Sequence, residues 1–232
     1  MTVQRARDPA WPSGIDHAAR LCRSWIELRG NDPMLRAGLA RIGRRRVVLV
    51  ATASDERGQR RHLTVGAFDL ARRAIQLAGR LGVPLLTLVD TPGADPSAAS
   101  EASGIAHAIA ETFATMASLS VPTVSVCVGE GGSGGALALA AADRLLALEH
   151  AIFTVITPEG AAAILRAGSD AVARIAAQLH LTAADLVDLG IADGVVADDG
   201  TALARAIDDA FEHAVVGDRQ RRLERASARV LD

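Results

Sequence analysis

The sequence predicts an α/β fold, in which apolar strands alternate with amphipathic helices. Three short runs of mostly apolar residues have the length of buried strands, at 47–52, 85–89 and 123–128. Between the first two, the apolar residues change to helical spacing over about 66–82. The chain has 232 residues, of which 50% are hydrophobic, and this is enough for one domain with a substantial core.

The other elements follow from apolar spacing and from residues that begin or end helices. Further helices are expected at 101–118, from 136 onward and at 159–166, 182–189 and 201–214, and further strands at 145–148 and 152–156. Gly82 and Gly190 are expected to end helices, because glycine readily takes the left-handed conformation found there. Pro158 marks the first turn of one helix, and Thr182 with Asp185 forms a capping box variant at the start of another.

A glycine-rich segment at residues 129–135 follows the third strand and reads Gly-Glu-Gly-Gly-Ser-Gly-Gly. So few side chains leave the backbone N–H groups as its main chemical resource. At the N-terminus of a helix these groups lack partners, and the helix dipole adds roughly half a positive charge. We therefore expect this segment to hold an oxyanion.

The glycine-rich segment matches two motifs of very different chemistry. From Gly129 it fits the Gly-x-Gly-x-x-Gly pattern of dinucleotide-binding proteins, with Glu149 about twenty residues further on. That pattern normally follows the first strand of its domain, and its place in mid-chain weakens a nicotinamide interpretation. Around Ser133 the segment fits the Gly-x-Ser-x-Gly elbow of serine hydrolases. Glycines that only permit a tight turn give the same pattern.

A second loop, from Asp90 to Ala94, follows the strand at 85–89 and reads Asp-Thr-Pro-Gly-Ala. Its first four residues also occur in GTPases, but these need an upstream phosphate loop that ends in Gly-Lys-Ser or Gly-Lys-Thr. The chain contains no lysine, since all 25 of its basic residues are arginine. This excludes P-loop, Schiff-base and lysine-base chemistry, and also the covalent attachment of biotin to this chain. Both loops leave the carboxyl ends of strands, where α/β sheets bind their ligands.

Composition argues against several other classes of protein. The net charge of −2 gives no nucleic-acid footprint, and the arginines at 44–46, 60–61 and 219–229 fit solvated surfaces. The two cysteines, Cys22 and Cys127, lack metal-ligand spacing, so no metal site is expected. Neither a membrane-spanning stretch nor a signal segment is evident. We therefore expect a cytoplasmic protein without nucleic-acid or membrane partners.

With these motifs the chain resembles the carboxyltransferase alpha subunit of bacterial acetyl-CoA carboxylase, a member of the crotonase superfamily. The resemblance runs from about residue 25 to residue 196. Its anchors are 25–30, 89–94, 129–138, 157–165 and 181–186, and Gly-Gly-Ala at 134–136 is similar to the oxyanion hole of that superfamily. The resemblance implies a crotonase-like fold of repeated ββα units in a single domain with a C-terminal helix. The implied boundaries are an N-terminal segment at 1–24, the carboxyltransferase domain at 25–200 and a C-terminal helical segment at 201–232.

The resemblance also implies an activity and its partners. Carboxyltransferases of this family move the carboxyl group from carboxybiotin, presented by a separate biotin carboxyl carrier protein, to an acyl-CoA. The product is malonyl-CoA or a homologue, as in fatty acid biosynthesis. In the family the alpha subunit supplies an oxyanion hole for biotin, and a beta carboxyltransferase subunit supplies one for the thioester. The chain is therefore expected to be a transferase that acts only with a beta subunit and holds no metal.

Specific residues are implied to form the oxyanion hole. The implied donors are the N–H groups of Gly134 and Gly135, with Gly93 and Ala94 closing the hole and with Gly132, Ser133 and Ala136 beside the biotin. In this interpretation Ser133 shapes the turn. A valine at Gly135 is expected to exclude the ligand and to leave the fold intact. Glu101 and Glu130 either orient loops or simply favour helix N-termini.

Two alternatives from other classes stay open at this point. In one, Ser133 is the nucleophile of a serine hydrolase, since its histidine and aspartate partners can be remote in sequence. In the other, the chain is a non-catalytic crotonase-fold subunit. The chain also departs from the family pattern, with Asp95 where an aromatic residue is common, Ser97 where glycine is usual and a shortened stretch at 53–66.

Overall fold

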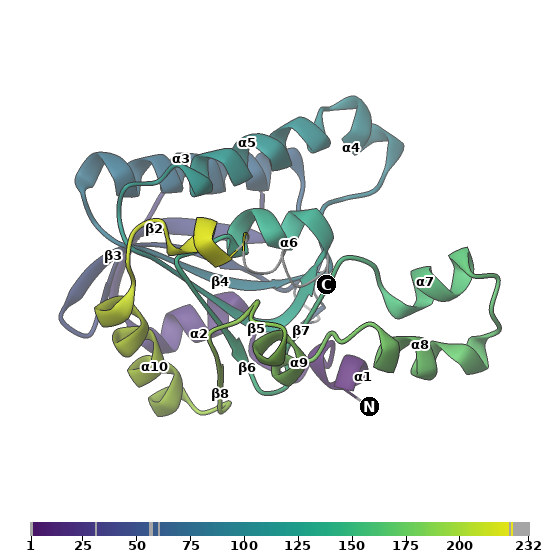
Figure 1. The fold of residues 1–232 in the computed structure, drawn as a ribbon. Helices are drawn as coiled ribbons and strands as arrows, with labels where there is room; N and C mark the ends of the chain where they lie inside the picture. The colour runs from purple at the N-terminus through teal and green to yellow at the C-terminus, as the bar shows by residue number, and fades with distance from the viewer. Residues whose placement is uncertain (1, 31, 56–57, 60, 223, 225–232) are drawn as a thin grey trace.

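The computed structural model describes residues 2–30, 32–55, 58–59, 61–222 and 224. The centre of this described part is one eight-stranded mixed sheet, with helices on both faces (Figure 1). Its strands are β1 (Cys22–Glu27), β2 (Leu35–Ile42), β3 (Arg45–Thr52), β4 (Leu85–Thr91), β5 (Thr123–Gly132), β6 (Arg144–Leu148), β7 (Ile152–Thr154) and β8 (Gly194–Val196).

The α-helices are α1 (Thr2–Ala6), α2 (Gly14–Leu21), α3 (Val65–Leu81), α4 (Ala98–Ala102), α5 (Ile105–Ala117), α6 (Ser133–Ala140), α7 (Pro158–Ile164), α8 (Val172–Gln178), α9 (Ala183–Asp188) and α10 (Gly200–His213). A short 3-10 turn, η1 (Ser169–Ala171), precedes α8. None of these described helices is long and apolar enough to cross a bilayer.

The strands lie in the order β1-β2-β3-β4-β5-β6-β8, so most neighbours in the sheet are also neighbours in the chain. β1, β2 and β3 form an antiparallel meander, whereas β3, β4, β5, β6 and β8 run parallel. β4 and β5 are buried along their whole length, as helices on both faces of a parallel sheet require. Because these two strands are parallel neighbours, their carboxyl ends meet at one edge of the sheet.

β5 pairs with two strands in succession. Its residues from Val124 to Cys127 pair with β6, and its residues from Glu130 to Gly132 pair with β7. The first part of the glycine-rich segment therefore lies inside the sheet instead of in a free loop.

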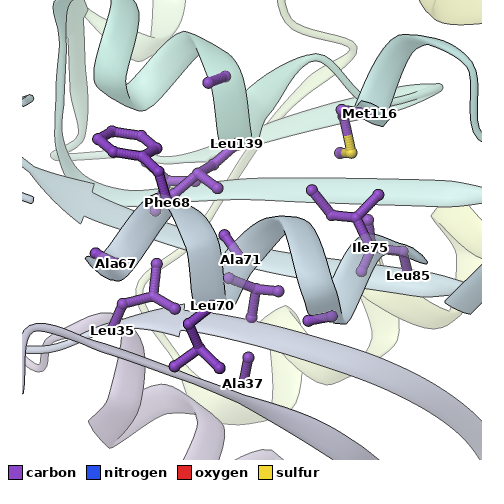
Figure 2. Close-up of a cluster of buried hydrophobic side chains, with 14 of the residues drawn as sticks. Leu35, Ala37, Ala67, Phe68, Leu70, Ala71, Ile75, Leu85, Met116 and Leu139 are labelled. Atoms are coloured by element: carbon purple, nitrogen blue, oxygen red, sulfur yellow. The ribbon is translucent and has the colours of Figure 1, made fainter. Parts of the chain in front are cut away.

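Two apolar cores lie on opposite faces of the sheet. Figure 2 shows the first core, where Phe68 of α3, Met116 of α5 and residues of α6 pack over the central strands. The second core lies under α2 and α10 and includes Phe211. Neighbouring residues of β3 belong to different cores, with Val48 in the first and Leu49 in the second, as the alternation of a pleated strand requires.

The α/β class is confirmed, and most elements lie close to their expected bounds. Gly82 ends α3 with φ +63°, and Thr182 with Asp185 forms the capping box of α9. The single helix expected at 101–118 is wrong, because Gly104 takes φ +85° and separates α4 from α5. β5 extends beyond its expected end, and α6 therefore begins earlier than residue 136. No pattern in the sequence predicts β1 and β2.

Described parts of both terminal segments pack against this body. Ala6 of α1 belongs to a small core with Ile152 of β7 and Leu181. After α10, Arg219 donates to the buried Asp143 carboxylate at 2.9 Å. The division of the chain after residues 24 and 200 stays a prediction, and residues 223 and 225–232 of the last segment lie outside the described part.

Candidate oxyanion site

The glycine-rich segment at residues 129–135 forms a direct turn from strand to helix. β5 continues to Gly132, which is the N-cap residue of α6, and α6 begins at Ser133. No described side chain caps α6, so the N–H groups of Ser133, Gly134 and Gly135 have no partner within the helix. These donors lie at the end of the helix where the dipole favours a negative oxygen.

The turn after β4 forms the opposite wall of the site. A Cβ placed on Gly135 would lie 2.5 Å from the Ala94 nitrogen. One placed on Gly132 would lie 2.0 Å from the Pro92 oxygen. Gly93 itself has φ +122°, a conformation that residues with side chains rarely adopt. Backbone therefore meets backbone across the site, and glycine on the α6 side permits this approach.

Hydrogen bonds hold the turn after β4 in one conformation. The Gly93 N–H donates to the Thr91 hydroxyl oxygen at 3.1 Å, and the Gly93 oxygen accepts from the Leu63 N–H at 2.8 Å. The Asp95 N–H donates to the Leu63 oxygen at 3.0 Å. The Gly93 N–H is therefore engaged within its own turn, whereas the described part of the chain contains no acceptor for the Ala94 N–H.

The predicted site residues lie around this junction. Ser133 is exposed, Gly134 and Ala94 are half-buried, and Gly93, Gly132, Gly135 and Ala136 are buried. Ala136 is the fourth residue of α6 and belongs to the first core, so helical geometry directs its N–H toward the Gly132 carbonyl. Ser133, Gly134 and Ala94 are thus the most exposed of these residues, and their contact with a ligand stays a prediction.

Ser133 has the backbone conformation of a nucleophile elbow but lacks the partners. Its φ is +56°, unusual for a residue other than glycine. Among the described residues none makes a hydrogen bond with its hydroxyl. The two candidate histidines have other partners. His180 Nδ1 lies 3.6 Å from an Asp185 carboxylate oxygen, and His213 Nδ1 lies 2.9 Å from the Asp209 backbone oxygen of its own helix. The geometry does not favour a serine hydrolase.

Glu130 contributes to the site in a way that no local pattern predicts. Its side chain is only 4% exposed, and its carboxylate accepts hydrogen bonds from Arg7, which lies 123 residues earlier. Its N–H donates to the Asp90 carboxylate at 3.0 Å. Glu101, by contrast, is exposed in the first turn of α4, where an acid favours a helix N-terminus.

Asp95 and Ser97, which depart from the family pattern, form one capping unit. The Asp95 carboxylate accepts from the Ser97 N–H at 3.0 Å and from its hydroxyl at 2.9 Å. The Ser97 hydroxyl oxygen accepts in turn from the Ser100 N–H at 3.2 Å, at the start of α4. The Asp95 carboxylate is therefore held at the start of α4.

A groove of about 700 Å³ lies far from this junction, between the β2–β3 turn and α10. Arg45 crosses it, with its guanidinium carbon 5.2 Å from the ring centre of Phe211 and an ion pair to Asp208 at 3.2 Å. The groove lies at the amino end of β3, whereas the candidate oxyanion site lies at the carboxyl ends of the neighbouring parallel strands. The groove is therefore not part of the candidate oxyanion site.

Known proteins with similar sequences share these motifs. A family profile described as acetyl co-enzyme A carboxylase carboxyltransferase-like matches residues 1–227. The chain is 45% identical over 206 residues to the acetyl-coenzyme A carboxylase carboxyl transferase subunits beta/alpha of Salinispora tropica. It is 43% identical over 209 residues to the corresponding subunit alpha of Zymomonas mobilis. Each match covers 84% of this chain, but the chain spans only 36% of the first protein and 66% of the second.

Solved structures agree with the crotonase-like fold. Transcarboxylase 12S, with methylmalonyl-coenzyme A and methylmalonic acid bound, superposes with a TM-score of 0.77 at 27% identity, covering 88% of this chain and 42% of that one. A Pseudomonas malonate decarboxylase hetero-tetramer in complex with coenzyme A gives a TM-score of 0.79 at 21% identity, with 95% and 97% covered, and supports the fold alone. By its profile match and its relatives above 40% identity, the chain belongs to the acetyl-coenzyme A carboxylase carboxyltransferase-like family.

Proposed function

We propose that the chain is the alpha-type carboxyltransferase subunit of a biotin-dependent acyl-CoA carboxylase. In this role it takes part in moving a carboxyl group from carboxybiotin to an acyl-CoA, to give malonyl-CoA or a homologue. The observation that carries the proposal is the uncapped N-terminus of α6, set against the turn after β4. Membership of the family supports the reaction class.

The residues at this junction fit a flat, polar ring that approaches the backbone. A Cβ on Gly134 would meet only Ile109, at 3.8 Å, so the surface in front of the α6 N-terminus is open. Carboxybiotin supplies the carboxyl group when it is bound here. The N–H groups of Ser133, Gly134 and Ala94 are placed to donate to an oxygen that gains negative charge. Each such donor is typically worth about 3 kcal/mol of transition-state stabilisation.

The buried glycines have a different role in this proposal. Gly135 and Gly93 set the distance between the two walls, because a side chain on either would strike backbone of the other wall. Gly132 and Ala136 hold the start of α6 in place. The site therefore uses backbone groups only, in agreement with a chain that has neither lysine nor tyrosine.

We propose a beta carboxyltransferase subunit as the partner. The Salinispora relative carries beta and alpha subunits in one protein, and this chain spans about a third of it. The thioester oxygen of the acyl-CoA would then be held by the beta subunit. Biotin must arrive on a separate carrier protein, because this chain has no lysine to which it could be attached.

Turnover with and without a beta subunit tests this function. The assay follows decarboxylation of malonyl-CoA in the presence of free biotin, for the chain alone, for the beta subunit alone and for their complex. We expect turnover only in the complex. Full turnover by the chain alone, or none by a complex that assembles, would contradict the proposal. Labelling of Ser133 by a fluorophosphonate would instead support the hydrolase alternative.

A further inference from the structure

Three side chains from distant parts of the sequence meet beside the glycine-rich segment. Arg7 directly follows α1 and donates from Nε and Nη2 to one oxygen of Glu130, at 3.0 and 2.6 Å. Its remaining nitrogen, Nη1, donates to the Glu159 carboxylate at 3.2 Å. Glu130 belongs to β5 and Glu159 to the first turn of α7, so one guanidinium bridges two elements.

The two halves of this bridge differ in burial and therefore in strength. The Glu130 side chain is 4% exposed and that of Glu159 is 56% exposed. A carboxylate removed from water needs a charged partner, whereas an exposed ion pair contributes little. Burial alone would lower the pKa of Arg7, but the hydrogen bond to Glu130 and the charges of both carboxylates raise it. Arg7 therefore stays charged at any physiological pH, and its pairing with Glu130 is the stronger half.

Apolar packing holds the N-terminal segment at the same point. Ala6, fully buried, packs with Ile152 of β7 and with Leu181. Ile152 is also the residue of β7 that pairs directly with Glu130. In Figure 1, α1 lies at the base of the arm that α7 and α8 form beside the sheet. The segment before residue 8 thus contacts the glycine-rich segment in two ways. Arg7 bonds directly to Glu130, and Ala6 packs on β7, which pairs with the glycine-rich segment.

We propose that Arg7 is a positioning residue of the candidate oxyanion site, which holds the glycine-rich segment through Glu130 and ties α7 to it through Glu159. The free N–H groups of α6 begin at Ser133, three residues after Glu130. Gly131 and Gly132 lie between them and pair with β7, and Gly132 also lies against the backbone of Pro92, so a shift at Glu130 would be passed on to the start of α6. The kinetic part of this inference rests on the proposed function, and its structural part does not.

Hydrogen exchange on the full chain tests the structural part. Arg7→Gln removes the guanidinium and leaves a shorter, uncharged amide, whereas Glu130→Gln replaces the carboxylate by an amide of the same size, and each variant breaks the Arg7–Glu130 ion pair. Arg5→Gln is the matched control, because Arg5 lies two residues earlier, in α1, and its guanidinium carbon is 5.2 Å from the ring centre of Trp11. We expect amide exchange over residues 129–135 to become at least about tenfold faster in the first two variants and to stay native in the control. Native exchange rates in Arg7→Gln would overturn the proposal. If Arg7→Gln does not fold, native exchange rates in Glu130→Gln would overturn it instead.

Kinetics of the complex with a beta subunit test the positioning role. At a temperature well below Tm, we expect Arg7→Gln to lower kcat about tenfold to a hundredfold and to leave KM for malonyl-CoA unchanged. KM should hold because the proposed thioester site is on the partner. A kcat loss no greater than that of Arg5→Gln would overturn the proposal.

The conservative variant Arg7→Lys separates charge from geometry. A single ammonium group keeps the charge but cannot reproduce the three-nitrogen bridge to two carboxylates. We therefore expect it to recover the native Tm but not the native kcat, and full recovery of kcat would contradict a bridging role. A wild-type complex without turnover would refute the proposed function, and the exchange experiment would still decide the inference about Arg7.

Discussion

Gly135 and Ala94 lie so close together that a Cβ on Gly135 would stand 2.5 Å from the Ala94 nitrogen. Gly135 is the third residue of α6, and Ala94 belongs to the turn after β4. The contact therefore fixes the separation of the two walls of the candidate oxyanion site. It also shows why two glycine-bearing segments that are about forty residues apart depend on each other.

Gly135→Val should lower both stability and turnover. From the sequence we expected the valine to block the ligand and to leave the fold intact, and this expectation is wrong because the Cβ meets backbone. Overpacking of this kind costs about 1–3 kcal/mol, measurable as a lower free energy of unfolding in urea. Gly134→Ala is the control for stability, since its Cβ would find only Ile109 at 3.8 Å. Native stability of Gly135→Val would mean that the walls can separate freely.

Ser133→Gly should make the protein more stable. Ser133 has φ +56°, and a left-handed residue with a side chain costs about 1–2 kcal/mol compared with glycine. We expect Tm to rise for Ser133→Gly alone, because alanine keeps the Cβ that makes this conformation costly. For both Ser133→Gly and Ser133→Ala we expect kcat of the complex to remain within a small factor of the native value. A nucleophile would instead lose about a thousandfold or more in kcat. Thermal unfolding and steady-state assays of both variants decide between the two roles.

Local signals explain which elements could be predicted from sequence. Gly82, Pro158 and the Thr182 capping box act within one turn of a helix, so the ends of α3, α7 and α9 follow from the sequence. β2 could not be predicted, because residues 35–42 are mostly alanine, glycine, leucine and arginine and have little strand propensity. It forms a strand by pairing with β3 on one side and β1 on the other, where Gly38 permits a close approach to Ile26.

The candidate site shows the same division between local and distant information. The run of glycines indicates a backbone oxyanion site, because a segment with few side chains leaves its backbone N–H groups open to a ligand. The partner of Glu130 could not be predicted, because Arg7 reaches it across 123 residues of sequence. Likewise, only the structure shows that the Gly93 N–H already donates a hydrogen bond to the Thr91 hydroxyl oxygen.

Stability should fall in mildly acidic solution. His17 and His150 are buried, and among described residues His17 Nε2 and both ring nitrogens of His150 have no hydrogen-bond partner. Burial lowers the pKa of both imidazoles, although the nearby Asp198 carboxylate opposes this. The unfolded chain then binds more protons than the folded one below about pH 6.5, so the free energy of unfolding decreases as the pH falls through that value.

Urea unfolding at a series of pH values measures this effect. We expect a constant free energy of unfolding from pH 8 to 7 and a decline below about pH 6.5, with a limiting slope of about 1.4 kcal/mol per pH unit for each histidine. His150→Phe keeps a ring to stack on Trp11, whose centre lies 4.4 Å from that of His150, and should reduce the slope. Carboxylates such as Asp185, whose pKa is lowered by the Thr182 hydroxyl, act only at lower pH. A slope that His150→Phe does not change would assign the effect to other groups.

Arg219→Met should cause a large loss of stability. Arg219 and Asp143 form an ion pair at 2.9 Å, with side chains that are 5% and 0% exposed. The same carboxylate accepts from the Thr123 N–H and hydroxyl and from the Gly217 N–H, so it joins β5, β6 and the segment after α10. Removing the guanidinium leaves a buried charge without its partner, which typically costs about 3–5 kcal/mol.

Two comparisons make the Arg219 prediction specific to burial. Arg221→Met removes a similar side chain from a pair with Asp218 in which the arginine is 61% exposed, and it should change the free energy of unfolding by less than about 0.5 kcal/mol. The double variant Asp143→Asn with Arg219→Met removes both charges and should recover part of the loss, because no unpaired charge is then buried. Asp143 precedes β6, at the opposite end of the parallel strands from α6, so each variant should keep the native kcat while it is folded. A loss below about 1 kcal/mol in Arg219→Met would show that water reaches the Asp143 carboxylate.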